Sequence, residues 1–287
     1  MTSTPLLAPT REELHRALGR GARHDDAVAL VPTMGALHEG HASLFRVARE
    51  RAGGGQVVAS VFVNPLQFGP GEDLDRYPRS LDADLELCAR EGVDLVFAPS
   101  VDEVYPGGEP EVTVDPGPLG AELEGASRPG HFAGVLTVVA KLFGLVRPDV
   151  AVFGQKDYQQ LLVIRRMVRD LALPIEIVAA PTLREANGLA MSSRNQYLTS
   201  EQRAHAGLIH QTLRGMGDAL RAGVAIEVIE RDARATLEQA GFQVDYIVLR
   251  RGEDLGVPEP GQRHGLVALA AAKLGRARLI DNFLIDL

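Results

Sequence analysis

The feature that most constrains this chain is an alternation of short apolar runs with longer amphipathic stretches over its first two thirds. Five runs have the length and composition of buried strands: AVALVP (27–32), QVVASVFV (56–63), DLVFAP (94–99), DVAVFG (149–154) and IEIVAA (175–180). The stretches between them have the spacing of helices with one apolar face. Strands that alternate with helices predict an α/β fold built on a parallel sheet.

This pattern changes near residue 181. Two helical stretches, 200–222 and 224–240, come before the apolar runs QVDYIVL, LVALAAA and ARLIDNFLI. Helices grouped apart from strands predict a separate α+β domain. We therefore expect one domain over residues 1–181 and a smaller domain over 182–287.

Composition excludes several classes of protein. A formal charge of −8 argues against nucleic acid as a partner, because phosphate backbones are bound by a surplus of Lys and Arg. The first ten residues, MTSTPLLAPT, lack the features of a secretion signal, and no apolar run is long enough to span a membrane, so we expect a cytoplasmic protein. The single cysteine, Cys88, lies at helical spacing from Leu81 and Leu85, which indicates core packing.

The segment VPTMGALHEGH (31–41) combines a strand end, a glycine turn and a helix start. Such a turn directs backbone N–H groups and the positive end of a helix dipole at one point, which suits a phosphate. His38 and His41 are three residues apart and can lie on one side of the first helical turn. Gly40 between them leaves room for a base or ribose.

Other interpretations of the two histidines remain open at this point. They fit a pair of surface residues at a helix start equally well. A metal site is less well supported, because His-Glu-Gly-His lacks the i, i+4 spacing of zinc-protease helices and no third ligand is evident.

A second candidate is FGQKDYQQL (153–161), where a strand end leads through Gly154 into a helix. Asp157 suits the N-cap of that helix, which is an ordinary structural role. Lys156 is harder to explain structurally, because a cation at a helix N-terminus opposes the dipole, so it suggests an anionic partner. Gln160, one turn later, can hydrogen-bond a hydroxy acid from the same helix face.

Three loops add further candidate residues. AMSSRNQYL (190–198) offers hydroxyls and a guanidinium suited to closing over phosphates, although the same residues fit an ordinary polar linker. The long loop 64–80 and the glycine-rich stretch 120–135 carry uncharged or titratable groups suited to a small polar acid. These groups are Asn64, Gln67, Tyr77, Glu124 and His131, of which the last two equally suit helix capping.

Five ordered motifs together resemble those of the pantothenate synthetases: PTMGALHEGH, FVNPLQFGPGEDLDRYPR, ELEG followed by RPGHFAGVLTVVAKL, FGQKDYQQL and REANGLAMSSRNQYL. HEGH is similar to the HIGH signature of the nucleotidyltransferase superfamily, and MSSRN to its KMSKS counterpart. The resemblance implies a homodimer, a Rossmann-like N-terminal domain that binds ATP, Mg²⁺ and pantoate, and a C-terminal lid domain.

The resemblance also implies site residues. Those on ATP-contacting positions are Met34, Gly35, Ala36, Leu37, His38, Glu39, Gly40, His41, Gly154, Gln155, Lys156, Asp157, Leu183, Met191, Ser192, Ser193 and Arg194. Those in the substrate region for pantoate and β-alanine are Gln67, Gln160, Asn64, Tyr77, Glu124 and His131. No protein ligand for Mg²⁺ is assigned, and we expect the metal to be held mainly by the phosphates of ATP.

The implied chemistry is ATP-dependent joining of pantoate to β-alanine through a pantoyl adenylate, with release of pyrophosphate and then AMP. His38, His41, Lys156, Ser192, Ser193 and Arg194 are the expected catalytic residues. Two rival functions share the HxGH chemistry or the fold: a nucleotidyltransferase that leaves the nucleotide on its product, and a nucleotide-binding sensor without turnover. A tRNA ligase fits less well, because the chain is short and acidic.

Overall fold

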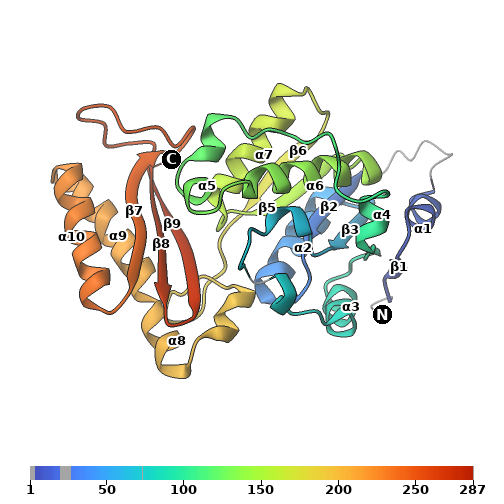
Figure 1. The fold of residues 1–287 in the computed structure, drawn as a ribbon, viewed down its shortest axis with the longest axis horizontal. Coiled ribbons are helices and arrows are strands. Elements are labelled where there is room, and N and C mark those ends of the chain that lie inside the picture. The colour runs from blue at the N-terminus through green and yellow to red at the C-terminus, as the bar shows by residue number, and fades with distance from the viewer. Residues whose placement is uncertain (1–3, 20–26, 73, 287) are drawn as a thin grey trace. The chain divides into compact units, whose positions relative to one another are not determined.

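The computed structural model describes residues 4–19, 27–72 and 74–286 (Figure 1). The chain divides into two compact units. Unit 1 contains Met1–Gln155 and Val163–Pro181, and unit 2 contains Lys156–Leu162 and Thr182–Leu287. Each unit has its own sheet and is described separately below.

Unit 1 is built on a six-stranded sheet whose paired strands all run parallel, as the alternating pattern predicts. In sheet order the strands are β1 (Leu6–Ala8), β4 (Leu95–Phe97), β3 (Gln56–Val61), β2 (Val28–Thr33), β5 (Val150–Gly154) and β6 (Glu176–Ala180). The strand order changes direction at β2, which pairs with both β3 and β5. Open α/β sheets bind ligands at the carboxyl ends of the strands beside such a point.

Helices of unit 1 connect these strands and cover the sheet (Figure 1). They are α1 (Arg11–Ala17), α2 (Glu39–Ala52), α3 (Leu81–Arg90), α4 (Val101–Val104), α5 (Glu124–Ser127) and α6 (His131–Val146), while α7 (Tyr158–Asp170) is shared with unit 2. Phe45 and Ala48 of α2 pack with Cys88 of α3 on one face of the sheet. Burial raises the pKa of Cys88 to about 12, so its thiol stays protonated and serves as core, as its spacing predicts.

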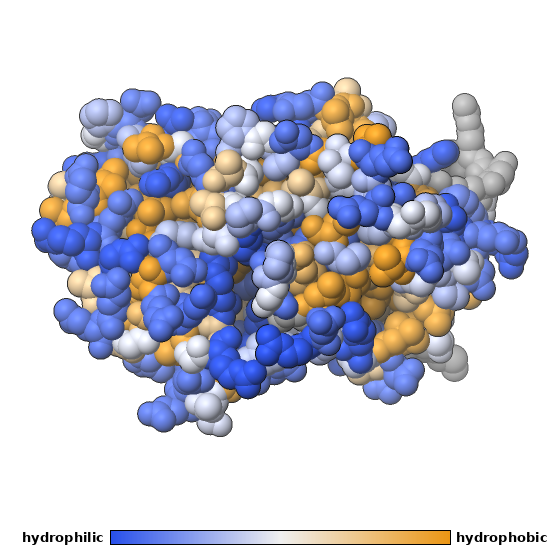
Figure 2. Space-filling model, in the orientation of Figure 1, coloured by the Kyte–Doolittle hydropathy of each residue, from blue (hydrophilic) through white to orange (hydrophobic). Residues whose placement is uncertain are grey.

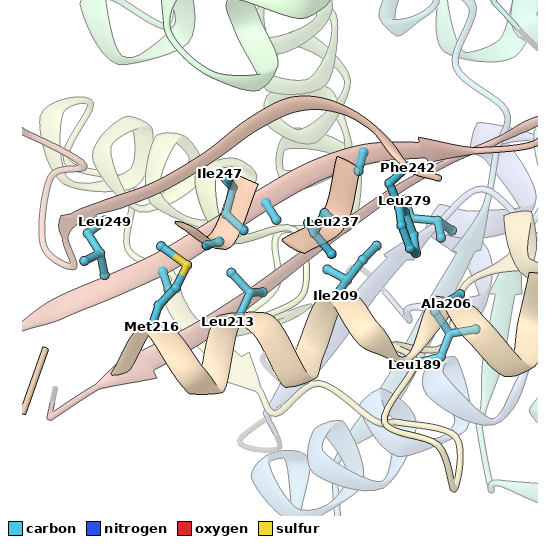
Figure 3. Close-up of a cluster of buried hydrophobic side chains, with 14 of the residues drawn as sticks. Leu189, Ala206, Ile209, Leu213, Met216, Leu237, Phe242, Ile247, Leu249 and Leu279 are labelled. Atoms are coloured by element: carbon cyan, nitrogen blue, oxygen red, sulfur yellow. The ribbon is translucent and has the colours of Figure 1, made fainter. Parts of the chain in front are cut away.

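Unit 2 places two long helices on a three-stranded antiparallel sheet. The helices α8 (Ser200–Ala206), α9 (Leu208–Arg221) and α10 (Ile226–Gln239) precede β7 (Gln243–Arg251), β8 (Leu266–Leu274) and β9 (Ala277–Ile285). Ile209, Leu213 and Met216 form one stripe of α9 at helical spacing, and Figure 3 shows them directed at the sheet. Leu189, from the loop before α8, joins the same core.

Two local features differ from the sequence-based expectation. The stretch 200–222 forms two helices divided at Gly207, where a Cβ would lie 2.2 Å from the carbonyl oxygen of Asn187. The Asn187 side chain also donates a hydrogen bond to the carbonyl of Arg203 (2.8 Å). The break therefore arises from a loop that packs against the helix backbone. The second feature is β1, a three-residue edge strand that the pattern of apolar runs does not predict.

Exposed apolar side chains are few and dispersed along the chain. Among the described residues they include Leu6, Leu7 and Val112. On the face drawn in Figure 2, hydrophobic residues are most concentrated over the part of unit 1 that contains β3 and α3. Within the described part of the chain, every helix is too short or too polar to cross a bilayer.

Candidate active site

A sharp turn joins the end of β2 to the start of α2. Gly35 and Ala36 adopt left-handed backbone conformations, with φ of 79° and 50°. The buried carboxylate of Asp84, from α3, accepts hydrogen bonds from the backbone N–H groups of Ala36 (3.1 Å) and Leu37 (2.7 Å). Burial raises the pKa of Asp84, and the two backbone donors oppose that shift. A side chain at Gly35 has no room, because its Cβ would lie 2.8 Å from Asp84 Oδ2.

The two histidines cap the N-terminus of α2 reciprocally. Nδ1 of His38 accepts a hydrogen bond from the N–H of Gly40 (3.1 Å), and Nδ1 of His41 accepts one from the N–H of His38 (3.2 Å). Their ring centroids are 4.2 Å apart, so the rings lie side by side, as the spacing predicts. Because Nδ1 is an acceptor in both rings, the hydrogen of each neutral imidazole resides on Nε2. The site thus has two Nε2–H donors at the positive end of a 14-residue helix.

Gln67 lies in a short 3₁₀ turn after β3, and its side chain contacts the neighbouring Asn64 and the more distant Met34. Asn64 Nδ2 donates a hydrogen bond to Gln67 Oε1 (3.1 Å), and the hydroxyl of Tyr105 donates to Asn64 Oδ1 (2.9 Å). Gln67 Nε2 contacts Met34 Sδ at 3.0 Å. The structure therefore brings the candidate substrate residues Asn64 and Gln67 to the turn that carries the candidate ATP residues.

His131 and Arg128 hold the backbone at Gln67. Nδ1 of His131 is 2.9 Å from the carbonyl oxygen of Gln67, and Arg128 Nη1 is 3.0 Å from His131 Nε2. Arg128 also pairs with Glu72 and donates to the Gln67 carbonyl (3.2 Å). Burial and the neighbouring Arg128 lower the pKa of His131 to about 4, so its ring is neutral near pH 7. In that form Nδ1–H donates to Gln67 and Nε2 accepts from Arg128.

Three further candidates of unit 1 lie at the end of a strand or in a loop. Gly154 ends β5, the strand beside β2, and the N–H of Gln155 donates to the carbonyl of Ala180 (2.8 Å). Both residues thus lie at the carboxyl edge of the sheet, beside the strand-order reversal. Tyr77 is buried, and its ring lies edge-on to that of Phe68 at 6.1 Å.

Two acidic candidates differ in their surroundings. Glu124 is buried at the start of α5, and its charge acts on His131. Glu39 instead pairs through its carboxylate with Arg46 (2.6 Å) and Arg90 (3.3 Å) in surface ion pairs. The backbone of Glu39 begins α2.

The candidates of unit 2 begin where β5 leads into α7. Lys156 and Asp157 precede the helix, with Nζ and Oδ2 3.8 Å apart. The carbonyl of Asp157 accepts the hydrogen bond from Leu161 N–H (2.9 Å), so Asp157 stands at the N-terminal boundary of α7. Gln160 lies in the first turn of that helix and is half-buried.

The second candidate segment of unit 2 is a hairpin that leads into a 3₁₀ turn. Met191 N–H donates to the carbonyl of Leu183 (2.9 Å), which closes the hairpin. Ser192 caps the turn Ser193–Tyr197 by accepting a hydrogen bond from Arg194 N–H (3.3 Å). The four residues from 191 to 194 are half-buried, so they combine a fixed backbone with accessible polar groups.

Several residues that shape this site escape local sequence reasoning. Asp84, Tyr105 and Arg128 act on residues 41 to 61 positions away in the sequence. No group of three or more His, Cys, Asp or Glu side chains arranged to hold a metal occurs in residues 4–19, 27–72 and 74–286.

Comparisons with known proteins agree with one another. The family model described as pantoate-beta-alanine ligase matches residues 7–284. A pantothenate synthetase of a Nocardioides species is 62% identical over 98% of this chain and 86% of that protein. The crystal structure of pantothenate synthetase from Thermus thermophilus has a TM-score of 0.90 and 48% identity, covering 98% of this chain and 100% of that one. The pantoate-beta-alanine ligase of Francisella tularensis, complexed with Beta-gamma ATP and Beta-alanine, has a TM-score of 0.82 and 33% identity, covering 98% and 97%.

Proposed function

The chain belongs to the pantoate–β-alanine ligase family, and we propose on that basis which part of the reaction each site residue serves. The enzyme is an ATP-dependent ligase of pantothenate biosynthesis that condenses pantoate with β-alanine. Joining a carboxylate to an amine requires a better leaving group than hydroxide. We propose that AMP is that group and that the reaction passes through a pantoyl adenylate.

In the first step the pantoate carboxylate attacks the α-phosphorus of ATP, and pyrophosphate leaves. The carboxylate needs no general base, because it is ionised near neutral pH. In the second step the unprotonated amine of β-alanine attacks the acyl carbon, the bond to AMP breaks, and the amine gives up a proton. The products are pantothenate and AMP.

The observation that carries the proposal is the pair of imidazoles at the start of α2. His38 and His41 present Nε2–H donors where the strand order of the sheet reverses, which is where α/β folds bind nucleotides. Donors fixed in advance stabilise the charge that develops on the phosphates as pyrophosphate leaves. Lys156, together with Ser192, Ser193 and Arg194, supplies further phosphate contacts in this proposal, by resemblance of the motifs.

Gln67 is proposed to hold pantoate. Its amide is fixed by Asn64, and its backbone carbonyl by His131 and Arg128, so the group is oriented before substrate arrives. Gln160 is proposed to complete the pantoate contacts. Tyr77 and Glu124 are proposed to line the same substrate region.

Mg²⁺, a homodimer and a cytoplasmic location complete the proposal. We propose that Mg²⁺ binds mainly through the phosphates of ATP, because this ion usually takes few protein ligands beside substrate phosphates. When bound, the ion neutralises phosphate charge. The homodimer is tested by light scattering coupled to size-exclusion chromatography.

The decisive experiment for the chemistry is exchange of labelled pyrophosphate into ATP, with Mg²⁺ present and β-alanine absent. Exchange that requires pantoate establishes the adenylate half-reaction. Replacement of Lys156 by Ala should lower that exchange while leaving the circular dichroism spectrum unchanged. ATP binding without exchange, for pantoate and every related hydroxy acid, would contradict the proposed mechanism.

A further inference from the structure

Two adjacent buried polar residues lie in the middle of the apolar strand β9. Asp281 and Asn282 are 5% and 4% exposed, in the sequence ARLIDNFLI. Burial of a carboxylate and an amide is costly unless each is fully hydrogen-bonded. The partners of these two side chains therefore indicate what β9 retains them for.

Asn282 contacts the segment that carries Lys156. Its Nδ2 donates a hydrogen bond of 2.9 Å to the backbone carbonyl oxygen of Lys156, 126 residues earlier in the sequence. Lys156 lies between the end of β5 and the start of α7, outside both elements. This contact thus fixes the main chain at the residue whose side chain is proposed to bind phosphate. A second hydrogen bond holds the same segment to the rest of unit 2, because the hydroxyl of Tyr158 donates to the carbonyl of Gly252 (2.8 Å).

Asp281 contacts the hairpin that leads to Ser192. Its carboxylate pairs with both terminal nitrogens of Arg184, at 2.6 Å and 2.9 Å, and the carboxylate is 4% exposed. Arg184 also donates to the carbonyls of Gly188 (3.1 Å) and Asn282 (3.2 Å), so one guanidinium joins the hairpin to β9. A bidentate pair of this kind fixes orientation as well as distance.

His210 is not an alternative ion partner for Asp281. Its Nδ1 is 3.9 Å from Asp281 Oδ2 and has no hydrogen-bond partner among the described residues. Burial, and next the charge of Arg184, lower the pKa of His210, so the ring is neutral near pH 7. The ring packs against Gly188 and Phe283, where it supports the hairpin by contact.

The hairpin is also held by contacts of Leu189 and Glu185 with other parts of unit 2. Leu189 is buried in the hydrophobic core of unit 2, as Figure 3 shows. Glu185 accepts a hydrogen bond from Asn195 Nδ2 (2.9 Å) and pairs with Arg203, which ties the hairpin to the 3₁₀ turn after Ser192. Movement of the Arg184–Asp281 pair would therefore be transmitted to the residues 192–194.

We propose that Asp281 and Asn282 of β9 are positioning residues that hold the two phosphate-binding segments of unit 2, the Lys156 segment and the Leu183–Arg194 hairpin, in register with each other. Adjacent residues of a strand point to opposite faces, so one rigid strand can hold a different segment on each face. In this proposal Asp281 acts through Arg184, and Asn282 acts through the backbone carbonyl of Lys156. The inference rests on the proposed role of Lys156 in binding ATP.

The test is a double-mutant cycle in the pantoate-dependent pyrophosphate exchange assay. Asn282→Ala alone should lower the exchange rate at saturating substrates roughly 10- to 100-fold, the loss expected for a group misplaced by about 1 Å. In a Lys156→Ala background the same substitution should produce no further loss, because the side chain that Asn282 positions is already absent. Asn282→Leu, which keeps the volume and removes the donor, should behave in the same way and serves if the alanine variant is poorly folded.

Arg263→Met is the matched control. Arg263 also donates to backbone carbonyls of unit 2, those of Leu220 (2.8 Å) at the end of α9 and Gly223 (3.2 Å) just after it, and neither carbonyl belongs to the Lys156 segment or to the Leu183–Arg194 hairpin. Its loss should lower the melting temperature and leave the exchange rate unchanged. A comparable fall in the exchange rate would show that this rate follows general destabilisation.

Two results would overturn the inference. One is wild-type exchange by Asn282→Ala and Asn282→Leu. The other is an equal fold-loss from Asn282→Ala with and without Lys156, which would mean that the two residues act independently. Wild-type exchange by Lys156→Ala alone is a separate result, because it removes the proposed role of Lys156 on which the inference depends.

Discussion

Replacing Gly134 with Ala tests whether the position of Gln67 controls pantoate binding. Gly134 lies in α6 with its Cα against the backbone of the turn that carries Gln67. A Cβ at this position would lie 2.2 Å from the carbonyl oxygen of Leu66 and 2.7 Å from the N–H nitrogen of Gln67. Because ordinary contact begins at 3.4 Å, the Leu66 oxygen must retreat by roughly 1.2 Å (3.4 − 2.2).

The expected effect on stability is small. Alanine is favoured over glycine in a helix interior by about 1 kcal/mol, whereas overpacking costs about 1 to 3 kcal/mol. The net change in the free energy of unfolding is therefore a loss of about 0 to 2 kcal/mol. The folded enzyme should remain available for assay.

The expected effect on activity is much larger. A shift of about 1 Å in a substrate-positioning group can cost about 100-fold in rate. The same change strains the hydrogen bond from Asn64 Nδ2 to the carbonyl of Gly134 (3.1 Å), so the amide of Gln67 loses support as well. Steady-state kinetics with varied pantoate should show a fall in kcat/KM for pantoate of about that size.

Gly144→Ala is the matched control in the same helix. A Cβ at Gly144 meets no atom within 4 Å, and the residue is exposed. This variant should keep wild-type kinetics and gain up to about 1 kcal/mol of stability. Gly134→Ala with unchanged kcat/KM for pantoate would refute the reasoning.

Three further predictions concern groups that shape the site or the core. Asp84→Asn should raise KM for ATP and lower the free energy of unfolding by about 1 to 2 kcal/mol, because an amide has one acceptor oxygen for the two N–H groups of Ala36 and Leu37. Steady-state kinetics with varied ATP measure the first effect, and urea melts measure the second. The folded pKa of His131, about 4, lies below its ordinary value of 6.5, so the protein loses at most about 3 kcal/mol of stability as the pH falls from 6.5 toward 4. Urea melts across this range should show that the free energy of unfolding depends less steeply on pH in His131→Asn, and an unchanged dependence counts against the assignment. Leu213→Ala should destabilise the protein by about 2 to 5 kcal/mol in thermal melts, because Leu213 is fully buried, and a change below about 1 kcal/mol would contradict the packing of α9.

The sheet of unit 1 could be predicted because its central strands are buried on both faces. Runs such as AVALVP and DVAVFG are apolar throughout, and this composition is a local property of the chain. The edge strand β1 has only three residues, of which Leu6 and Leu7 are exposed, so no such signal marks it. The break at Gly207 depends on the approach of Asn187, which is a tertiary contact.

The same distinction applies to the candidate site. The side chains of HEGH and SSR could be proposed as candidates because each motif is continuous in sequence. The groups that hold those motifs could not, because they are ordinary residues whose partners lie far away. Asp84 has the pattern of an acidic residue in the first turn of a helix, and Asn282 that of a polar interruption in a strand. Only the fold assigns each to the backbone group that it binds.

The reciprocal cap at the start of α2 means that each imidazole has one structural role and one proposed chemical role. Its Nδ1 accepts a backbone hydrogen bond of the cap, and its Nε2–H is the donor that we propose for phosphate. An asparagine at His38 or His41 offers an acceptor near the place of Nδ1 and no donor at Nε2, whereas a glutamine reaches the Nε2 position and gives up the cap. Under the proposed mechanism, a substitution that preserves the cap removes the phosphate donor, and one that preserves the donor weakens the cap. On that proposal, new activities would evolve on this scaffold through changes at positions other than 38 and 41.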